Sequence, residues 1–123
     1  DAMKANYNID PKKTLITGFS MGGAGTWYMA SRHQDRFAAA IPIAARPDDS
    51  MLDVDWRISL LVIHSLEDEV VPFGPVDEMV RALKEKDITI DMIIVSGLTH
   101  FQTQGFIQPL ESAVAWIRDI WGE

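Results

Sequence analysis

The sequence predicts an α/β fold, with a mostly parallel sheet of about four strands and helices on both faces. Short apolar segments of strand length alternate with segments in which apolar residues recur at helical spacing. The apolar segments at residues 38–45 and 58–64 do not alternate with polar residues, which is typical of strands buried on both faces. A length of 123 residues without repeats or linkers indicates one domain.

The elements are expected in a regular order. Residues 1–7 have the pattern of the last turns of a helix, which the Asp10-Pro11 pair would end. The expected strands are residues 14–19, 38–45, 58–64 and 90–95, and the expected helices are residues 21–33, 74–86 and 109–121. This alternation implies right-handed crossovers between parallel strands, whose ligands bind at the carboxyl ends of the strands.

Two of these elements carry specific packing expectations. By helical spacing, the inward face of the helix at residues 21–33 would comprise Ala24, Trp27, Tyr28 and Ser31. In the second strand, Pro42 stands at a position that central strands seldom allow, because proline cannot donate a hydrogen bond to the ladder.

Composition and charge narrow the class of protein. Apolar residues make up 47% and charged residues 24%, as in ordinary folded domains. A net charge of −7 disfavours nucleic-acid and anionic-membrane partners, and no apolar run reaches the roughly 18 residues of a membrane helix. The absence of cysteine excludes disulfides, thiolate metal sites and a cysteine nucleophile. It leaves the compartment open between the cytoplasm and secretion after removal of a leader.

The junction between the first expected strand and the first expected helix carries a nucleophile pattern. The segment Gly18-Phe19-Ser20-Met21-Gly22 reads G-x-S-x-G. A strand that turns straight into a helix places Ser20 on a tight, strained corner, where flanking glycines avoid collisions with the neighbouring strand and helix. The helix N-terminus also favours a developing oxyanion. The alternative is a glycine-rich turn whose serine only caps the helix, but the strand-to-helix context favours a nucleophile.

A serine nucleophile needs a base, and the sequence offers three histidines. His33, near the end of the first long helix, is expected to be solvated or to be a favourable charge at the helix C-terminus. His64 ends the third strand, where a packed or hydrogen-bonded histidine is the ordinary outcome. His100 lies in a loop just after the last strand, at the same sheet edge as Ser20, so we predict that His100 is the general base.

An acidic cluster after the third strand, Glu67-Asp68-Glu69, supplies candidates for the carboxylate that fixes the tautomer of the base. On composition any of the three could serve, and the alternative is a solvated acidic loop. We predict Asp68, because the order Ser20, Asp68, His100 matches the Ser…Asp…His order of α/β-hydrolases. This order differs from those of the chymotrypsin and subtilisin types.

These segments resemble the α/β-hydrolase serine esterases, nearest to a group of esterases, peptidases and polyhydroxybutyrate-depolymerase-like enzymes. The resemblance runs across nearly all of the chain and is carried by residues 9–23, 25–27, 35–40 and 64–72. Residues 64–72 are similar to the H-G-x-x-D-x-x-V-P stretch of that group, which implies that Asp68 is the acid and that His64 is a structural residue. The G-x-x-H pattern of the group places the base at His100. Ser65 departs from the usual glycine, which is expected to shift the acid loop slightly.

The resemblance also implies a truncated α/β-hydrolase domain over residues 1–123, holding only the C-terminal half of the fold. Family members have further strands and an H-G-G-type loop before the nucleophile strand, and this sequence holds no counterpart. Of the oxyanion donors, the motif therefore supplies only the N–H of Met21. The nucleophile strand would form an exposed apolar edge, and such edges seek partners. We therefore expect a homodimer or higher homo-oligomer.

The predicted function is that of a carboxylesterase-type serine hydrolase for small, short-chain acyl esters, with no metal or cofactor. Apolar Met21, Leu66, Phe73 and Phe101 would line an acyl pocket or belong to the core. A chain this short leaves no room for an inserted lid, so an open, shallow site is expected. A peptidase or thioesterase would use the same triad. An inactive remnant that serves as a binding or assembly module is the alternative of a different class.

Overall fold

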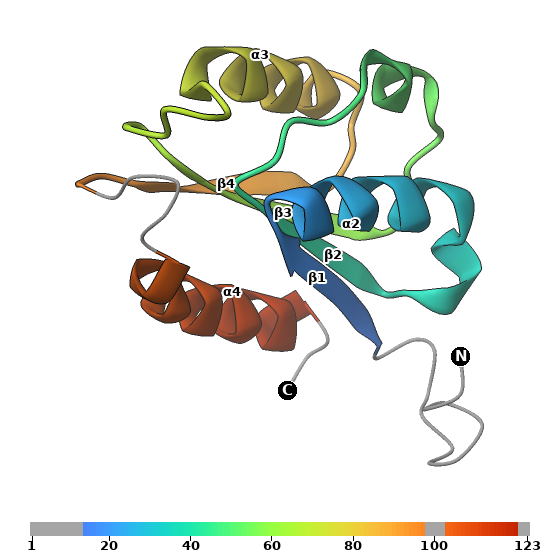
Figure 1. The fold of residues 1–123 in the computed structure, drawn as a ribbon. Coiled ribbons are helices and arrows are strands. Elements are labelled where there is room, and N and C mark those ends of the chain that lie inside the picture. The colour runs from blue at the N-terminus through green and yellow to red at the C-terminus, as the bar shows by residue number, and fades with distance from the viewer. Residues whose placement is uncertain (1–13, 98–102, 121–123) are drawn as a thin grey trace.

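The computed structural model describes residues 14–97 and 103–120. Its sheet contains four parallel strands in the order β1-β2-β3-β4, namely β1 (Leu15–Phe19), β2 (Ala39–Ile43), β3 (Ser59–Ser65) and β4 (Ile90–Val95). In the described part of the chain, the α-helices are α2 (Met21–Arg32) and α3 (Phe73–Lys84) on one face of the sheet and α4 (Ile107–Ile120) on the other (Figure 1). The predicted fold is confirmed, while the helix expected at residues 1–7 lies outside the described residues.

Within residues 14–97 and 103–120, three short 3-10 helices were not predicted. They are η2 (Gln34–Arg36), η3 (Asp49–Asp53) and η4 (Thr103–Phe106). Each is a single turn or little more, too short to show an apolar period in the sequence. Across the described ranges, none of the helices is both long enough and apolar enough to cross a membrane.

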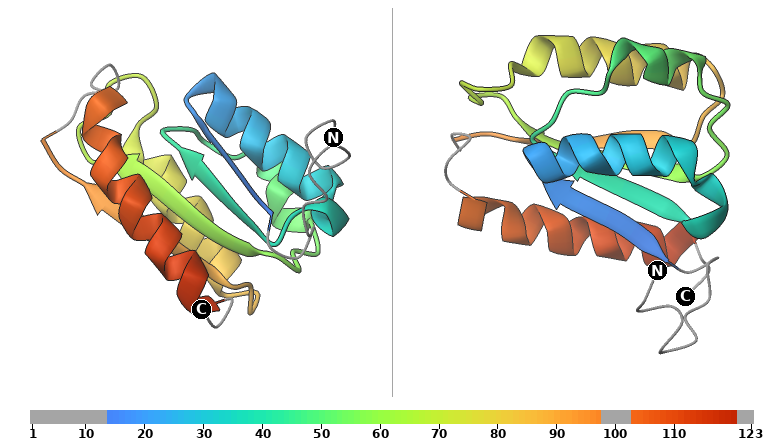
Figure 2. Two further views of the ribbon diagram at one scale, coloured as in Figure 1. Left: turned by 90° about the horizontal axis from the view of Figure 1, so that it is seen from below. Right: turned by 45° about the vertical axis from the view of Figure 1, so that its right-hand side comes forward.

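The central strands are buried on both faces, as their continuous apolar sequences predicted. On β3, Leu60 and Val62 join the core beneath α2 and α3, whereas Leu61 and Ile63 join the core beneath α4. Figure 2 shows α4 lying alone across its face of the sheet. Two apolar layers therefore fix β3 from both sides, and the residues that follow its carboxyl end are held on a rigid support.

The strand register brings three chain segments to one edge of the sheet. Phe19 pairs with Ile43, and Ile43 pairs with Ile63. The β3–β4 ladder continues to the pair of Ser65 and Val95. Because all strands are parallel, the residue after β1 and the loops after β3 and β4 emerge together at the carboxyl edge. Pro42 does lie within β2, opposite Gly18 of β1.

The predicted inward face of α2 is wrong except for Trp27. The buried residues of α2 are Gly23, Thr26, Trp27 and Ala30, whereas Ala24 and Tyr28 are exposed and Ser31 is half-buried. Small residues let a helix approach a sheet closely. The contact face of α2 is built mainly from such residues, so a search for apolar spacing selected the neighbouring face instead.

Candidate active site

Ser20 is the single residue between β1 and α2, and its backbone is strained. Its φ of 57° and ψ of −114° lie in a region that residues other than glycine rarely adopt. The N–H of Ser20 donates to the Ile43 carbonyl at 2.8 Å, and its own carbonyl accepts from the Ala24 N–H at 2.9 Å. The side chain makes no capping hydrogen bond to α2. A serine that only capped the helix would need such a bond and no strain.

Two glycines allow α2 to begin so close to the sheet. A Cβ added at Gly18 would lie 2.2 Å from the Gly22 carbonyl oxygen, and one added at Gly23 would lie 2.6 Å from the Ile43 carbonyl oxygen. At Gly22, by contrast, an added Cβ meets no described atom within 4 Å. The steric expectation is therefore confirmed for Gly18 and wrong for Gly22. The second required glycine is Gly23, because that position faces the end of β2.

Met21 is the first residue of α2, the position that the motif assigns to an oxyanion donor. The N–H groups of a first helical turn have no partner within the helix. The Met21 side chain is 89% exposed and thus lies outside the core. The assignment of its N–H as a donor stays a prediction.

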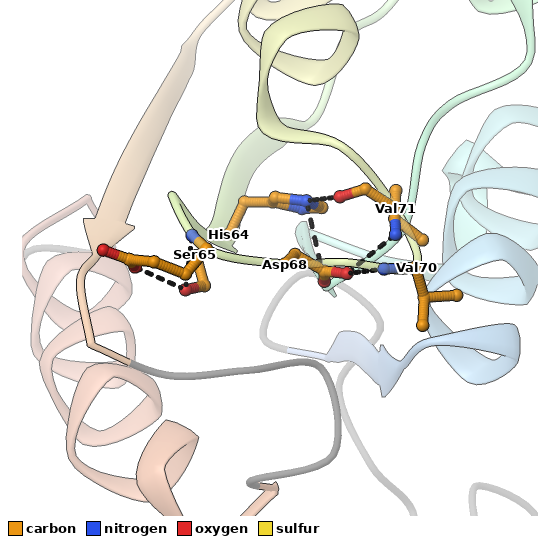
Figure 3. A network of polar contacts seen from close by, with 6 residues as sticks. His64, Ser65, Asp68, Val70 and Val71 are labelled. Carbon is orange, nitrogen blue, oxygen red and sulfur yellow. Dashed lines mark hydrogen bonds and ion pairs between the residues drawn. The ribbon is translucent and has the colours of Figure 1, made fainter.

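Asp68 lies in the turn between β3 and α3, which we call the acid turn (residues 65–71). Its side chain is fully buried. Oδ1 accepts from the N–H groups of Val70 at 2.9 Å and Val71 at 2.7 Å (Figure 3). Glu67 and Glu69, its neighbours in the acidic cluster, are exposed. Of these three carboxylates, only that of Asp68 is buried, like the aspartate of a Ser-His-Asp triad.

His64 is packed and hydrogen-bonded, as one of the sequence expectations stated. Its ring is fully buried, and Nε2 lies 2.7 Å from the Val71 carbonyl oxygen and 3.8 Å from Asp68 Oδ2. His33 caps the C-terminus of α2, at the opposite end of that helix from Ser20. The predicted base, His100, lies outside the described residues.

Sequence reasoning missed a link between the acid turn and the end of β4. Glu67 Oε2 accepts from the Gly97 N–H at 2.9 Å, and the Ser65 hydroxyl lies 3.3 Å from both Glu67 Oε2 and the Glu67 N–H nitrogen. The Leu66 N–H donates to the Val95 carbonyl at 2.8 Å. The departure from glycine at Ser65 thus supplies a hydroxyl that orients Glu67. No pattern in the sequence marks this contact.

Apolar side chains at this edge of the sheet are largely open to solvent. Leu66 is 50% and Val70 is 51% exposed. Together with the exposed Met21, this shows that Leu66 and Met21 are not core residues. Phe73 is half-buried with its ring centroid 6.4 Å from that of His64, and Phe101 lies outside the described residues.

An open cavity of about 840 Å³ lies between the exposed side of α2 and the segment 46–54. Its lining includes Ala24, one helical turn from Ser20, but not Ser20 itself. On its far wall the Arg46 guanidinium lies 3.3 Å from Asp49.

The backbone N–H of Ser50, which donates to Asp48 Oδ1, holds the pKa of Asp48 below its usual range. Among the described residues no group of three His, Asp or Glu side chains could hold a metal ion.

The profile of the dienelactone hydrolase family matches residues 1–115. The chain belongs to the dienelactone hydrolase family. Protein usf of Aquifex pyrophilus is 26% identical over 101 residues, covering 81% of this chain and 44% of that protein. Poly(3-hydroxyalkanoate) depolymerase C of Paucimonas lemoignei is 49% identical over 47 residues, covering 38% of this chain and 11% of that protein. The crystal structure of a thermostable esterase superposes with a TM-score of 0.80 at 30% identity, over 96% of this chain and 34% of that chain.

The chain spans less than half of the length of each of these three proteins. The match to residues 1–115 establishes the family, and the superposition on the esterase establishes the fold. This dienelactone hydrolase family chain shares its α/β-hydrolase fold with esterases, and its activity is a proposal.

Proposed function

We propose that this chain is a serine hydrolase of the carboxylesterase type that cleaves small, short-chain acyl esters. One observation carries the proposal. A strained serine without a capping role stands at the same sheet edge as a buried, backbone-anchored aspartate. Strain of this kind persists where the surrounding structure enforces it and is concentrated at functional sites.

In the proposed reaction, Ser20 Oγ attacks the ester carbonyl while His100 removes its proton. The Met21 N–H stabilises the oxyanion, and His100 returns the proton to the departing alcohol. Water, activated by His100, then releases the acid and regenerates Ser20. Asp68 orients His100 and stabilises the imidazolium. Its Oδ1 is fixed by two backbone N–H groups, so its carboxylate would need no reorganisation during the reaction.

The preference for short acyl groups rests on two apolar side chains of the acid turn. Leu66 and Val70 are about half exposed to solvent, which favours small acyl groups over long chains that need a buried apolar channel. A thermostable esterase and a poly(3-hydroxyalkanoate) depolymerase among the similar proteins support ester substrates. The same triad would serve a peptidase or thioesterase, since the constellation does not select the leaving group.

The proposal is tested by hydrolysis of p-nitrophenyl acetate, butyrate and octanoate by the purified chain, with Ser20→Ala as the control. We expect turnover of the two short esters that is lost in Ser20→Ala. A higher kcat/KM for octanoate would contradict the short-chain preference. Covalent labelling of Ser20 by a fluorophosphonate separates the active enzyme from an inactive binding or assembly module, because only an activated serine reacts.

We also propose that a second copy of the chain covers the open side of β1, the outer strand of the sheet, giving a homodimer or higher oligomer. Within the described residues β1 pairs only with β2, and Leu15, Ile16 and Phe19 are half-buried. Unpaired backbone groups along an edge are a template for strand pairing. Sedimentation at micromolar concentration tests this expectation, and a monomer contradicts it.

A further inference from the structure

We propose that His64 is a positioning residue, which holds the acid turn in the conformation that fixes Asp68. The proposal deepens the proposed function and rests on it, because Asp68 orients a base only if the serine mechanism operates. His64 touches no reacting atom in this scheme. It acts through the backbone of Val71.

A chain of two hydrogen bonds connects His64 to the acid (Figure 3). The Val71 carbonyl oxygen can only accept, so Nε2 of His64 carries the proton and donates it across 2.7 Å. The N–H of the same Val71 donates to Asp68 Oδ1 at 2.7 Å. Both polar backbone atoms of Val71 are thereby held, one by the histidine and the other by the acid.

The contact between His64 and Asp68 is not a direct hydrogen bond. Nε2 lies 3.8 Å from Asp68 Oδ2, beyond hydrogen-bonding distance. The hydrogen-bonded connection from the histidine to the acid therefore passes through Val71. Release of the Val71 carbonyl would free the turn whose N–H groups anchor Oδ1.

Packing alone does not explain a histidine at this position. The ring is fully buried, and Nδ1 has no hydrogen-bond partner among the described residues. Burying an unpartnered ring nitrogen is unfavourable, so a site that needed only volume would favour leucine. The specific contribution of the imidazole is the Nε2 donor. Glutamine is the replacement that places a donor nitrogen at a similar reach.

Three variants test the proposal. His64→Leu keeps volume and removes the donor, whereas His64→Gln restores a donor. Val62→Ala is the matched control, because Val62 is fully buried two residues earlier on the same strand and in the core beneath α2 and α3. Each variant is examined for kcat and KM on p-nitrophenyl acetate, and for amide hydrogen exchange at Val70 and Val71 by NMR.

We expect kcat of His64→Leu to fall about 10- to 100-fold with little change in KM, as for a misplaced catalytic group. Exchange at Val70 and Val71 should accelerate. His64→Gln should recover most of both properties. Val62→Ala should keep kcat and the protection of both amides even though its stability falls.

Other outcomes overturn the proposal. If Val62→Ala lost kcat as much as His64→Leu, a general loss of stability would explain both variants. If His64→Gln behaved like His64→Leu, the Nε2 donor would have no role. A wild-type chain without Ser20-dependent turnover would contradict the proposed function itself. In that case, unchanged exchange at Val70 and Val71 in His64→Leu would separately overturn the role of His64 in holding the turn.

Discussion

The serine corner (residues 18–23) and the acid turn lie at the same, carboxyl edge of the sheet but are built on different principles. Backbone proximity determines the serine corner: Ser20 is strained, and the carbonyls of Gly22 and Ile43 leave no space for a Cβ at Gly18 or Gly23. Side-chain hydrogen bonds determine the acid turn, where Asp68 binds two backbone N–H groups and His64 holds a carbonyl.

This difference determines how each region should respond to substitution. The serine corner needs glycines without a Cβ, so we expect an added side chain to disrupt it. A turn that depends on polar side chains fails when a donor or an acceptor is removed, and it fails most where that group is buried. The following predictions test this distinction, ordered by the size of the expected change in the free energy of activation or of unfolding.

The largest effect is expected on activity, from Asp68→Asn in the acid turn. The variant keeps an Oδ1 acceptor for Val70 and Val71 but removes the charge that orients and stabilises the base. We expect kcat to fall about 10⁴-fold, as when a triad aspartate is replaced by asparagine, which corresponds to about 5.4 kcal/mol. Steady-state hydrolysis of p-nitrophenyl acetate measures the loss.

Glu69→Gln is the matched control, because Glu69 is the exposed neighbour of Asp68. Its kcat should match that of the wild type within about twofold, as for most surface substitutions. Equal losses in the two variants would mean that the whole acidic cluster acts through its charge, and that Asp68 has no distinct role.

The next largest effect is expected on stability, from Gly18→Ala in the serine corner. The new Cβ would stand 2.2 Å from a backbone carbonyl oxygen, so β1 and α2 must move apart. We expect a loss of about 3 kcal/mol or more in the free energy of unfolding. Gly22→Ala adds the same atom where no described atom lies within 4 Å, so it should change stability by about 1 kcal/mol or less. Urea denaturation measures the free energy of unfolding of both variants. Similar losses in Gly18→Ala and Gly22→Ala would contradict the steric explanation.

The sequence predicted the serine corner more completely than the acid turn, and the two mechanisms explain why. Contacts that exclude a side chain leave glycines in the sequence, so Gly18 could be identified as a constrained position, although Gly23 could not be separated from Gly22. Among Glu67, Asp68 and Glu69, composition alone left three candidates. Only the fold shows that Asp68 is buried and its neighbours are exposed. Likewise, no sequence pattern marks the bond between Glu67 and Gly97, which are 30 residues apart.

A smaller effect is expected from that exposed bond. Glu67→Ala removes the acceptor of the Gly97 N–H, which lies at the start of the segment leading to His100. Because the carboxylate is exposed, we expect a loss of stability of about 1 kcal/mol or less. Amide exchange at Gly97 should accelerate, whereas Glu69→Ala should leave it unchanged. Unaltered exchange in Glu67→Ala would show that the bond does not hold this end of β4 in solution.

The smallest effect is expected at Asp48, which forms an exposed counterpart of the acid turn. Its Oδ1 accepts from the N–H two residues later, as Asp68 Oδ1 does. That bond from Ser50 lowers the pKa of Asp48, so the ionised carboxylate stabilises the folded state at neutral pH. The stabilisation is complete above the usual aspartate pKa of about 3.9 and is lost as pH falls through the lower pKa of the folded state.

Asp48→Asn keeps an oxygen acceptor and removes only the charge. We therefore expect a slightly lower Tm than that of the wild type near pH 7, and a difference that shrinks as pH falls below about 4. Thermal unfolding between pH 3 and 7 measures the difference between the two proteins. A gap that widened on acidification would reverse the assigned sign. If the Tm of Asp48→Asn fell as far as that of a variant that loses a buried hydrogen bond, solvent exposure would not weaken this type of turn. Burial would then not explain the importance of Asp68.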